Sequence, residues 1–180
     1  MSLLTDKLGS VYAAARDEIK TLVKEHGDKV VSQVTLAQAY GGMRGVKSLV
    51  CDTSEVPPDK GLIIRGIELK ELTGKLPEEI YWLLLSGELP NAAELAELQQ
   101  ELSARSAVPE YVWSVMSAMP ADSHPMAMFN TAILIMQKES VFARRYNEGM
   151  TKDEYWKATL DDALNIVAKL PNIAAGIYRM

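Results

Sequence analysis

Apolar residues recur at steps of three and four near the start of the chain, which is the pattern of an amphipathic helix. The apolar positions are Leu4, Leu8, Val11, Tyr12, Ala15, Ile19 and Val23. Gly27 follows directly after His26, and glycine is a common residue just past a helix end. The pattern therefore predicts an N-terminal helix over residues 3–25.

The pattern changes between residues 28 and 67, where short β-branched pieces are separated by glycines and prolines. These pieces read KVVSQVT, SLVCDTS and GLIIRGIEL. Ahead of the last piece, residues 57–61 read PPDKG, which has the composition of a turn. Short β-branched runs on either side of a turn are typical of hairpins, so a small β-hairpin region is expected near residues 30–67.

Helical periodicity returns after residue 76, and residues that favour helix starts divide it into several helices. Proline in the first turn and a Ser, Thr or Asn three residues before Glu are such signals. The predicted starts are Pro77, the pair Asn91 and Glu94, Pro109, Pro125, and the pair Thr151 and Glu154. Gly87 is expected to end the first of these helices. Together the elements predict a mainly α-helical protein.

The last predicted helix carries the clearest apolar stripe. Its members are Trp156, Leu160, Ala163, Val167 and Leu170. Pro171 either kinks or ends this helix, but the four-residue step from Ile173 to Ile177 shows that the period continues beyond it. The chain then stops at Met180 without a cap or a polar tail, so we expect a sequence cut within a helix.

The composition is that of an ordinary globular protein. The chain has 180 residues, of which 48% are hydrophobic and 24% charged, and its net charge is −5. Mild acidity disfavours a nucleic-acid-binding protein, which normally carries a clustered basic face. No apolar run approaches the roughly 18 residues that a membrane-spanning helix needs. Neither nucleic acid nor a membrane is therefore expected as a partner.

The single cysteine, Cys51, excludes a disulfide within one chain and favours a reducing compartment. The first residues lack the basic start and compact apolar centre of a secretion signal. They also include acidic residues early, which disfavours an organelle transit peptide. The sequence thus predicts a bacterial cytoplasm, with the mitochondrial matrix as the alternative.

The two histidines are weak candidates for catalysis. His26 lies at a predicted helix end among charged residues, where a solvated side chain is expected. His124 precedes the Met-rich helix, where a positive charge would oppose the helix dipole, so a neutral capping or packing role is expected. Neither histidine has a partner at a spacing that general acid–base catalysis would use.

No other catalytic or metal-binding pattern is present. One cysteine and two distant histidines make no zinc spacing, and the sequence lacks a phosphate-binding loop, a dinucleotide fingerprint and a nucleophile elbow. The carboxylate pairs Glu78–Glu79 and Asp161–Asp162 are interpreted as solvated helix surface or favourable first-turn charge. We therefore predict no catalytic residue, no metal site and no cofactor.

Five methionines gather in one stretch of the predicted helices: Met116, Met119, Met126, Met128 and Met136. A flexible apolar set of this kind is more typical of a core or a subunit interface than of a ligand groove. Because neighbouring apolar residues add more surface than a short chain buries, the pattern favours an intersubunit interface.

The stretch YGGMRGVKSLVCDTS at residues 40–54 raises a separate question. Gly41, Gly42 and Gly45 surround Arg44, which indicates a tight turn with one cation. The arginine either binds an anionic ligand or simply faces water, and spacing alone leaves both readings open.

From this stretch to its last residue, the chain resembles the N-terminal part of citrate synthase, of the mitochondrial-like type. The matching stretches occur in the family's order and near its spacing. They are YGGMRGVKSLVCDTS, GLIIRGIEL, LPEEIYWLLLSGELP, HPMAMFNTAI, ESVFARRYNEGMTKDEYW and IVAKLPNIAAGIYR.

The resemblance implies an almost wholly helical fold and an obligate homodimer, with helices near residues 125–139 and 151–180 at its interface. Residues 1–180 would form an incomplete large domain, truncated before the small domain. The implied reaction condenses acetyl-CoA with oxaloacetate and water to citrate and CoA, at the entry of the tricarboxylic acid cycle. The CoA thioester is a substrate, and no cofactor is implied.

The resemblance also implies that the catalytic aspartate and histidines lie downstream of this chain, which is therefore expected to be inactive alone. His124 matches no catalytic motif of the family. Two cations do match positions that contact the CoA phosphates: Arg44 in GGMRG, and Lys152, where the family often has arginine. Lysine offers a point charge instead of a planar fork, so its match is weaker.

Other roles remain open at this point. The chain could be a non-catalytic helical dimerisation module or one subunit of a split enzyme. It could also belong to a 2-methylcitrate synthase, because the residues that would read the keto acid lie outside it.

Overall fold

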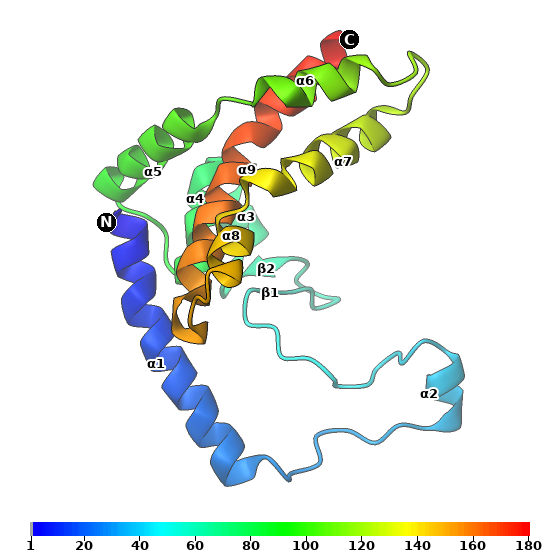
Figure 1. Ribbon diagram of the computed structural model, residues 1–180. Coiled ribbons are helices and arrows are strands. Elements are labelled where there is room, and N and C mark those ends of the chain that lie inside the picture. The colour runs from blue at the N-terminus through cyan, green and yellow to red at the C-terminus, as the bar shows by residue number, and fades with distance from the viewer. Residues whose placement is uncertain (1) are drawn as a thin grey trace. The chain divides into compact units, whose positions relative to one another are not determined.

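Helices make up most of the computed structural model, which describes residues 2–180 (Figure 1). The chain divides into two compact units, the first ending at Leu95 and the second beginning at Ala96. The α-helices are α1 (Leu3–His26), α2 (Leu36–Tyr40), α3 (Leu69–Leu72), α4 (Pro77–Ser86), α5 (Ala92–Arg105), α6 (Glu110–Ser117), α7 (Pro125–Ile135), α8 (Val141–Asn147) and α9 (Tyr155–Arg179). Two 3₁₀ turns, η1 (Met136–Glu139) and η2 (Lys152–Glu154), precede α8 and α9. The strands are β1 (Ser54–Glu55), β2 (Ile63–Ile64) and β3 (Ile67–Glu68).

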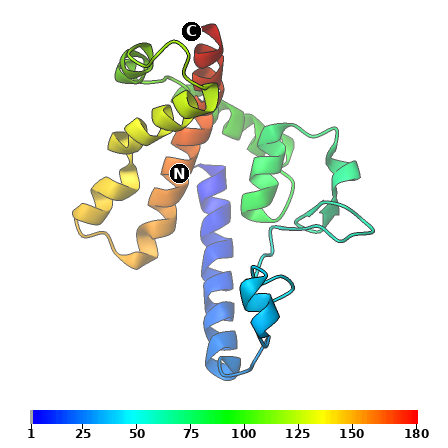
Figure 2. The same cartoon turned by 90° about the vertical axis from the view of Figure 1, so that its right-hand side faces the viewer.

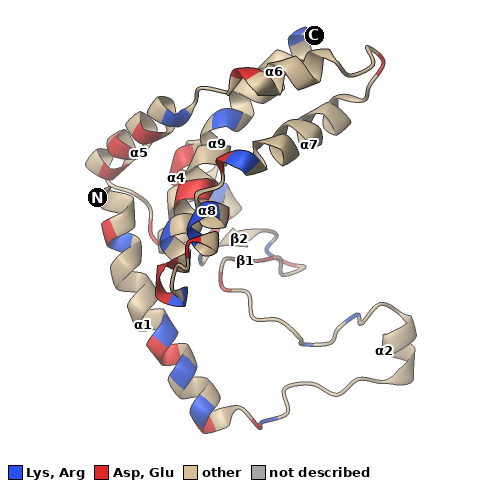
Figure 3. Ribbon diagram, viewed as in Figure 1, with Lys and Arg blue, Asp and Glu red and all other residues tan. Residues whose placement is uncertain are grey.

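The predicted N-terminal helix is confirmed as α1. Ser2 caps it by accepting a hydrogen bond from the Thr5 amide at 3.3 Å, and the Gly27 amide donates to the Val23 carbonyl oxygen at 2.8 Å. Charged residues colour its C-terminal half in Figure 3, where most side chains are exposed. Within the first unit α1 contacts α4, and Lys7 Nζ lies 2.8 Å from Glu88 Oε2. The hydrogen bond from Lys7 to Glu88 raises the pKa of Lys7.

The predicted β region is confirmed, but its strands occupy only residues 54–68. They form an antiparallel sheet in the order β1-β2-β3, with Ser54 opposite Ile64 and Ile63 opposite Glu68. A two-residue turn joins β2 to β3. Its central residues, Arg65 and Gly66, have φ of 48° and 81°, as the right-handed twist of a hairpin favours.

The β-branched pieces at 29–35 and 48–53 are not strands. No partner strand faces them within the described residues, and their apolar side chains are open to solvent: Val30 is 78% exposed and Leu49 88%. The helix α2 interrupts this stretch (Figure 1). Hydrophobic periodicity missed α2 because five residues complete little more than one turn. Its local signal is the capping box of Thr35 and Gln38.

The first unit has a small apolar core where the hairpin meets α3 and α4. Ile64, Leu72 and Leu83 are its buried members, and Leu83 has no exposed surface. The predicted boundaries of α4 are confirmed by Pro77 in its first turn and by Gly87, whose φ of 85° ends it. Glu79 accepts a hydrogen bond from the Leu76 amide at 2.8 Å, as expected for first-turn charge.

The second unit is built on α9, which lies beside α7 and α8 (Figure 2). Its core contains four of the five methionines: Met116 and Met136 are buried, and Met119 and Met128 pack against them. Met126 is instead 56% exposed. The sequence pattern favours an intersubunit interface for this set, and that interface stays a prediction. The helix α9 continues through Pro171 to Arg179, so the proline does not end it.

Two predictions for α9 are wrong in detail. The buried positions are Ala158, Leu160, Leu164, Ala168, Ile173 and Ile177, so only Leu160 of the predicted stripe is fully buried. Thr151 and Glu154 form no capping box at the start of α9, because the turn η2 comes between Thr151 and the helix. The Thr151 hydroxyl instead donates to Glu154 Oε2 at 3.3 Å, and Arg145 Nη2 lies 2.7 Å from Glu154 Oε1. This contact lowers the pKa of Glu154. The Asn91–Glu94 box does form, with the Asn91 amide 2.8 Å from Glu94 Oε2.

Candidate functional site

Arg44 lies in a tight turn after α2, and hydrogen bonds define the backbone of that turn. The Val46 amide donates to the Met43 carbonyl oxygen at 3.1 Å, which closes a four-residue turn with Arg44 in the second position. Gly45, in the third position, has a φ of 74°, where glycine is favoured. Met43 has a φ of 60°, which is uncommon for a residue with a Cβ atom.

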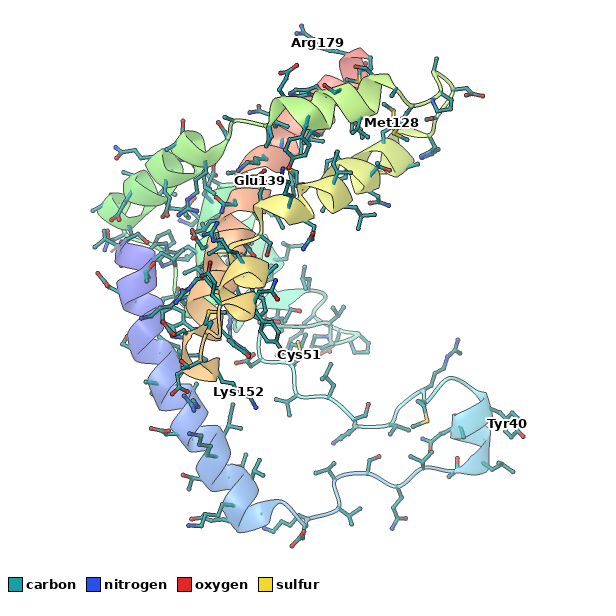
Figure 4. The ribbon with its side chains drawn as sticks, viewed as in Figure 1. Tyr40, Cys51, Met128, Glu139, Lys152 and Arg179 are labelled. Atoms are coloured by element: carbon teal, nitrogen blue, oxygen red, sulfur yellow. The ribbon has the colours of Figure 1, made fainter. Side chains whose placement is uncertain are left out.

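The side chain of Arg44 is exposed and makes no ion pair with any residue in the range 2–180. Its surroundings are also solvated: Figure 4 shows the side chain of Tyr40, on α2, pointing away from the ribbon. A guanidinium has five N–H donors and no acceptor. Arg44 therefore presents a planar cation that no residue of the range 2–180 pairs with, on a defined turn, which is a suitable arrangement for an anion such as a phosphate.

Lys152 opens η2 and is exposed (Figure 4). Within residues 2–180 its ammonium group forms no ion pair. It belongs to the second unit, and Arg44 belongs to the first. The structure thus places each predicted phosphate ligand at the surface of its own unit.

Sequence reasoning missed the role of Arg65. Its Nε and Nη2 donate to the Leu84 carbonyl oxygen at 3.0 and 2.8 Å, and its Nη1 lies 2.9 Å from the Asp52 carboxylate. Leu84 is in the last turn of α4, where unpaired carbonyl groups favour a cation. Arg65 therefore joins the hairpin turn to α4 and to Asp52, which lies just before β1. This role is structural.

A polar hollow of about 220 Å³ lies beside Arg65 and includes Cys51 in its lining. The Cys51 thiol lies 3.3 Å from the Thr53 hydroxyl oxygen. This hydrogen bond lowers the pKa of the exposed thiol. The thiolate form of Cys51 is therefore favoured. Among the described residues that line the hollow there is no histidine to act as a base and no second cysteine to form a disulfide.

The two histidines have the structural roles expected of them. His124 caps α7, because its Nδ1 accepts a hydrogen bond from the Met126 amide at 3.1 Å. That contact needs an unprotonated Nδ1, in agreement with the helix-dipole reasoning. His26 is the exposed last residue of α1.

The carboxylates of α9 are not simple solvated surface, so that prediction is wrong. Asp161 pairs with Arg105, whose Nη2 also lies 2.8 Å from Glu101 Oε1. Burial lowers the pKa of Arg105, but these two carboxylates raise it by more. Asp162 accepts three hydrogen bonds from the start of α8. Both aspartates hold helices together within the second unit.

Over residues 2–180, no three His, Cys, Asp or Glu side chains are grouped so that they could hold a metal ion. No helix in that range is long and apolar enough to cross a bilayer.

Comparison with known proteins identifies the family. The family model described as the C-terminal domain of citrate synthase matches residues 42–180. The mitochondrial citrate synthase of Saccharomyces cerevisiae is 42% identical over 98% of the chain and 39% of its own length. The chain belongs to the citrate synthase family. It spans about two fifths of the length of these curated relatives.

Related activities occur among the citrate synthase relatives. The mitochondrial 2-methylcitrate synthase of Yarrowia lipolytica is 40% identical over 98% of the chain and 40% of its own length. The chain is thus about equally similar in sequence to a citrate synthase and to a 2-methylcitrate synthase.

Solved citrate synthase structures share the fold of this chain. The enzyme of Pyrobaculum aerophilum superposes with a TM-score of 0.68 at 22% identity, over 84% of this chain and 39% of its own. The enzyme of Thermoplasma acidophilum, in ternary complex with carboxymethyl coenzyme A and oxaloacetate, gives a TM-score of 0.63 at 20% identity. That match covers 83% of this chain and 36% of the other. The mainly helical citrate-synthase-like fold class is confirmed.

The predicted bacterial cytoplasm is contradicted by the citrate synthase relatives. One relative from each of Saccharomyces cerevisiae, Emericella nidulans, Aspergillus niger and Neurospora crassa is a mitochondrial citrate synthase. A second relative from Saccharomyces cerevisiae, 37% identical, is peroxisomal. The first residues of a chain that spans about two fifths of such relatives were an unsound basis for predicting the compartment.

Proposed function

We propose that the protein to which these 180 residues belong is a citrate synthase, which condenses acetyl-CoA with oxaloacetate and water to citrate and CoA. Its family membership supports this activity. The observation that links the activity to a site is Arg44, whose guanidinium lies on a defined turn without an ion pair among residues 2–180. Residues 1–180 would form part of the large domain of that enzyme. The CoA thioester is a substrate, and the reaction uses no bound cofactor.

The chemistry divides between groups that bind and groups that react. A base must remove a proton from the acetyl methyl group, and donors must stabilise the oxyanion that develops on the thioester. We assign neither step to His26, which is exposed at the end of α1, nor to His124, whose Nδ1 caps α7. We assign to this chain the binding of CoA phosphates by Arg44 and Lys152, and we expect the reacting groups to lie in the remainder of the enzyme.

Titration of CoA into the 180-residue chain tests the role of Arg44. We expect Arg44→Ala to weaken CoA binding about tenfold, because charge-assisted hydrogen bonds to the phosphates are lost. Arg44→Lys is expected to lie in between, since lysine keeps the charge without the fork. Calorimetry gives the dissociation constants.

The matched control for this titration is Lys60→Ala, which removes another exposed cation of the first unit. Its CoA affinity should equal that of the original chain. An equal loss for Lys60→Ala and Arg44→Ala would assign the effect to net charge and contradict the proposed contact. Release of thiol from acetyl-CoA and oxaloacetate by this chain alone would contradict the expected absence of reacting groups.

We further propose a homodimer through α7, η1 and α9. Figure 3 shows α7 without a charged residue, and Leu134 on it is 72% exposed. An apolar hollow of about 270 Å³ lies between α7, η1 and α9, with Leu134 and Ile166 in its lining. Such a surface favours burial against a second protein surface.

Sedimentation tests the dimer. We expect the chain to sediment as a dimer and Leu134→Glu to sediment as a monomer, because a charge would be buried without a partner. Val56→Glu, at another exposed apolar position in the first unit, is the control and should leave the dimer intact. A monomeric parent chain would refute the interface.

A 2-methylcitrate synthase is the second candidate, on the strength of the Yarrowia lipolytica relative. The two candidates differ in the acyl group and share the CoA moiety. The proposed contacts of Arg44 and Lys152 are therefore the same in both.

A further inference from the structure

The side chain of Gln38 connects two backbone groups, one just before α2 in the sequence and one after it. Its Oε1 accepts a hydrogen bond from the Thr35 amide at 3.0 Å, and its Nε2 donates to the Arg44 carbonyl oxygen at 3.3 Å. The main-chain carbonyl oxygen of Gln38 also accepts from the Met43 amide at 2.8 Å. Gln38 thus contacts both Met43 and Arg44, the first and second residues of the turn.

Only one orientation of the Gln38 amide serves both side-chain contacts. The Thr35 amide is a donor and needs Oε1, whereas the Arg44 carbonyl group is an acceptor and needs Nε2. A glutamate would still complete the capping box with Thr35, because Thr-x-x-Glu is a common form of it. A glutamate could not donate to Arg44. The capping role and the contact with Arg44 can therefore be separated by a single substitution.

The contact with Arg44 matters because the turn has few other restraints. The stretch around α2 is exposed, and among the described residues the turn is restrained by the backbone bonds from Val46 to Met43 and from Met43 to Gln38, besides the Gln38 side chain. A binding group on a loop must lose conformational freedom when the ligand arrives, which weakens binding. A hydrogen bond that orders the loop beforehand removes part of that loss.

We infer that Gln38 is a positioning residue, which holds the Arg44 peptide so that the guanidinium is ready to bind a phosphate of CoA. This inference rests on the proposed role of Arg44 as a CoA ligand. It assigns to Gln38 a contribution to affinity that is made entirely through Arg44.

Comparison of Gln38→Glu, Arg44→Ala and the double variant tests this inference, with CoA as the probe and the 180-residue chain as the protein. We expect Gln38→Glu to weaken CoA binding about fivefold, which corresponds to one hydrogen bond. The double variant should bind no more weakly than Arg44→Ala, because the contribution of Gln38 requires the arginine. The NMR signal of the Arg44 Nε–H group should shift on addition of CoA, and the shift should need more CoA in Gln38→Glu.

Gln33→Glu is the matched control, since it adds the same charge at another exposed glutamine near α2. It should bind CoA within about twofold of the original chain. Native affinity in Gln38→Glu alongside weakened Arg44→Ala would overturn the positioning role and leave the proposed function standing. Native affinity in Arg44→Ala would overturn both. Equal losses in Gln33→Glu and Gln38→Glu would assign the effect to charge and overturn the positioning role.

Discussion

Asp162→Ala will lower the thermal stability of the chain substantially, because this carboxylate caps a helix that precedes it in the sequence. It accepts from the Ser140 hydroxyl at 2.6 Å and from the amides of Val141 and Phe142 at 2.7 and 3.1 Å. These amides belong to the first turn of α8, whose N–H groups have no partner inside the helix. The carboxylate also carries the charge that a helix N-terminus favours.

Alanine would leave two half-buried amides without an acceptor. We expect a loss of about 3 kcal/mol for the three contacts together. For a chain of this size the loss corresponds to a melting temperature lower by roughly 6–12 °C. Thermal unfolding followed by circular dichroism measures it. Asp162→Asn should lie in between, because its remaining oxygen can still accept one of the bonds.

The control for Asp162 is Asp122→Ala, at an exposed position in the same unit. Its melting temperature should remain within about 1–2 °C of the original, as for an ordinary surface substitution. Equal melting temperatures for Asp162→Ala and Asp122→Ala would show that the capping role is wrong.

Gly176→Ala is the second large effect, and its sign opposes that of helix propensity. Alanine in place of glycine inside a helix normally stabilises it by about 1 kcal/mol. Here a Cβ atom on Gly176 would lie 2.5 Å from Cζ3 of Trp113, far inside normal contact. Trp113 is partly buried and packs against the core of the second unit, so moving its ring aside would disturb those contacts. We expect a net loss of about 2 kcal/mol from overpacking.

Chemical denaturation of four chains isolates this contact: the original, Gly176→Ala, Trp113→Leu and the double variant. In the Trp113→Leu background the added methyl group should become neutral or stabilising, because the ring is gone. Gly74→Ala, where a Cβ atom meets nothing within 4 Å, is the control and should change stability little. Stabilisation by Gly176→Ala in the original chain would refute the clash.

Local sequence was sufficient wherever the interaction joins neighbours in the chain. The ends of α1, α4 and α7 follow from Gly27, Gly87 and Pro125, because caps and proline act within one turn. The Asn91–Glu94 box and the His124 cap formed for the same reason. The turn at Arg44 is also local, since Gly45 supplies the positive φ that it uses.

Tertiary contacts decided the rest. By sequence alone, Asp161 and Asp162 are expected to be solvated charges and Arg65 has no assigned role. In the fold Asp162 faces the start of α8, Asp161 pairs with Arg105, and Arg65 donates to the Leu84 carbonyl oxygen. In each case the partner lies at least 19 residues away in the sequence. Patterns of period three or four carry no information about such distant partners.

The amino-acid sequence alone determines the order of the helices and of the glycine-bounded turns. It also determines the family of the chain, because many short local signals in a fixed order are specific. Which charges serve structure and which remain free was settled only by the fold. Arg65 and Arg105 are paired, whereas Arg44 is exposed without an ion pair among residues 2–180. The physical reason is that pairing depends on what long-range packing brings within hydrogen-bond distance, and an arginine reads the same in either case.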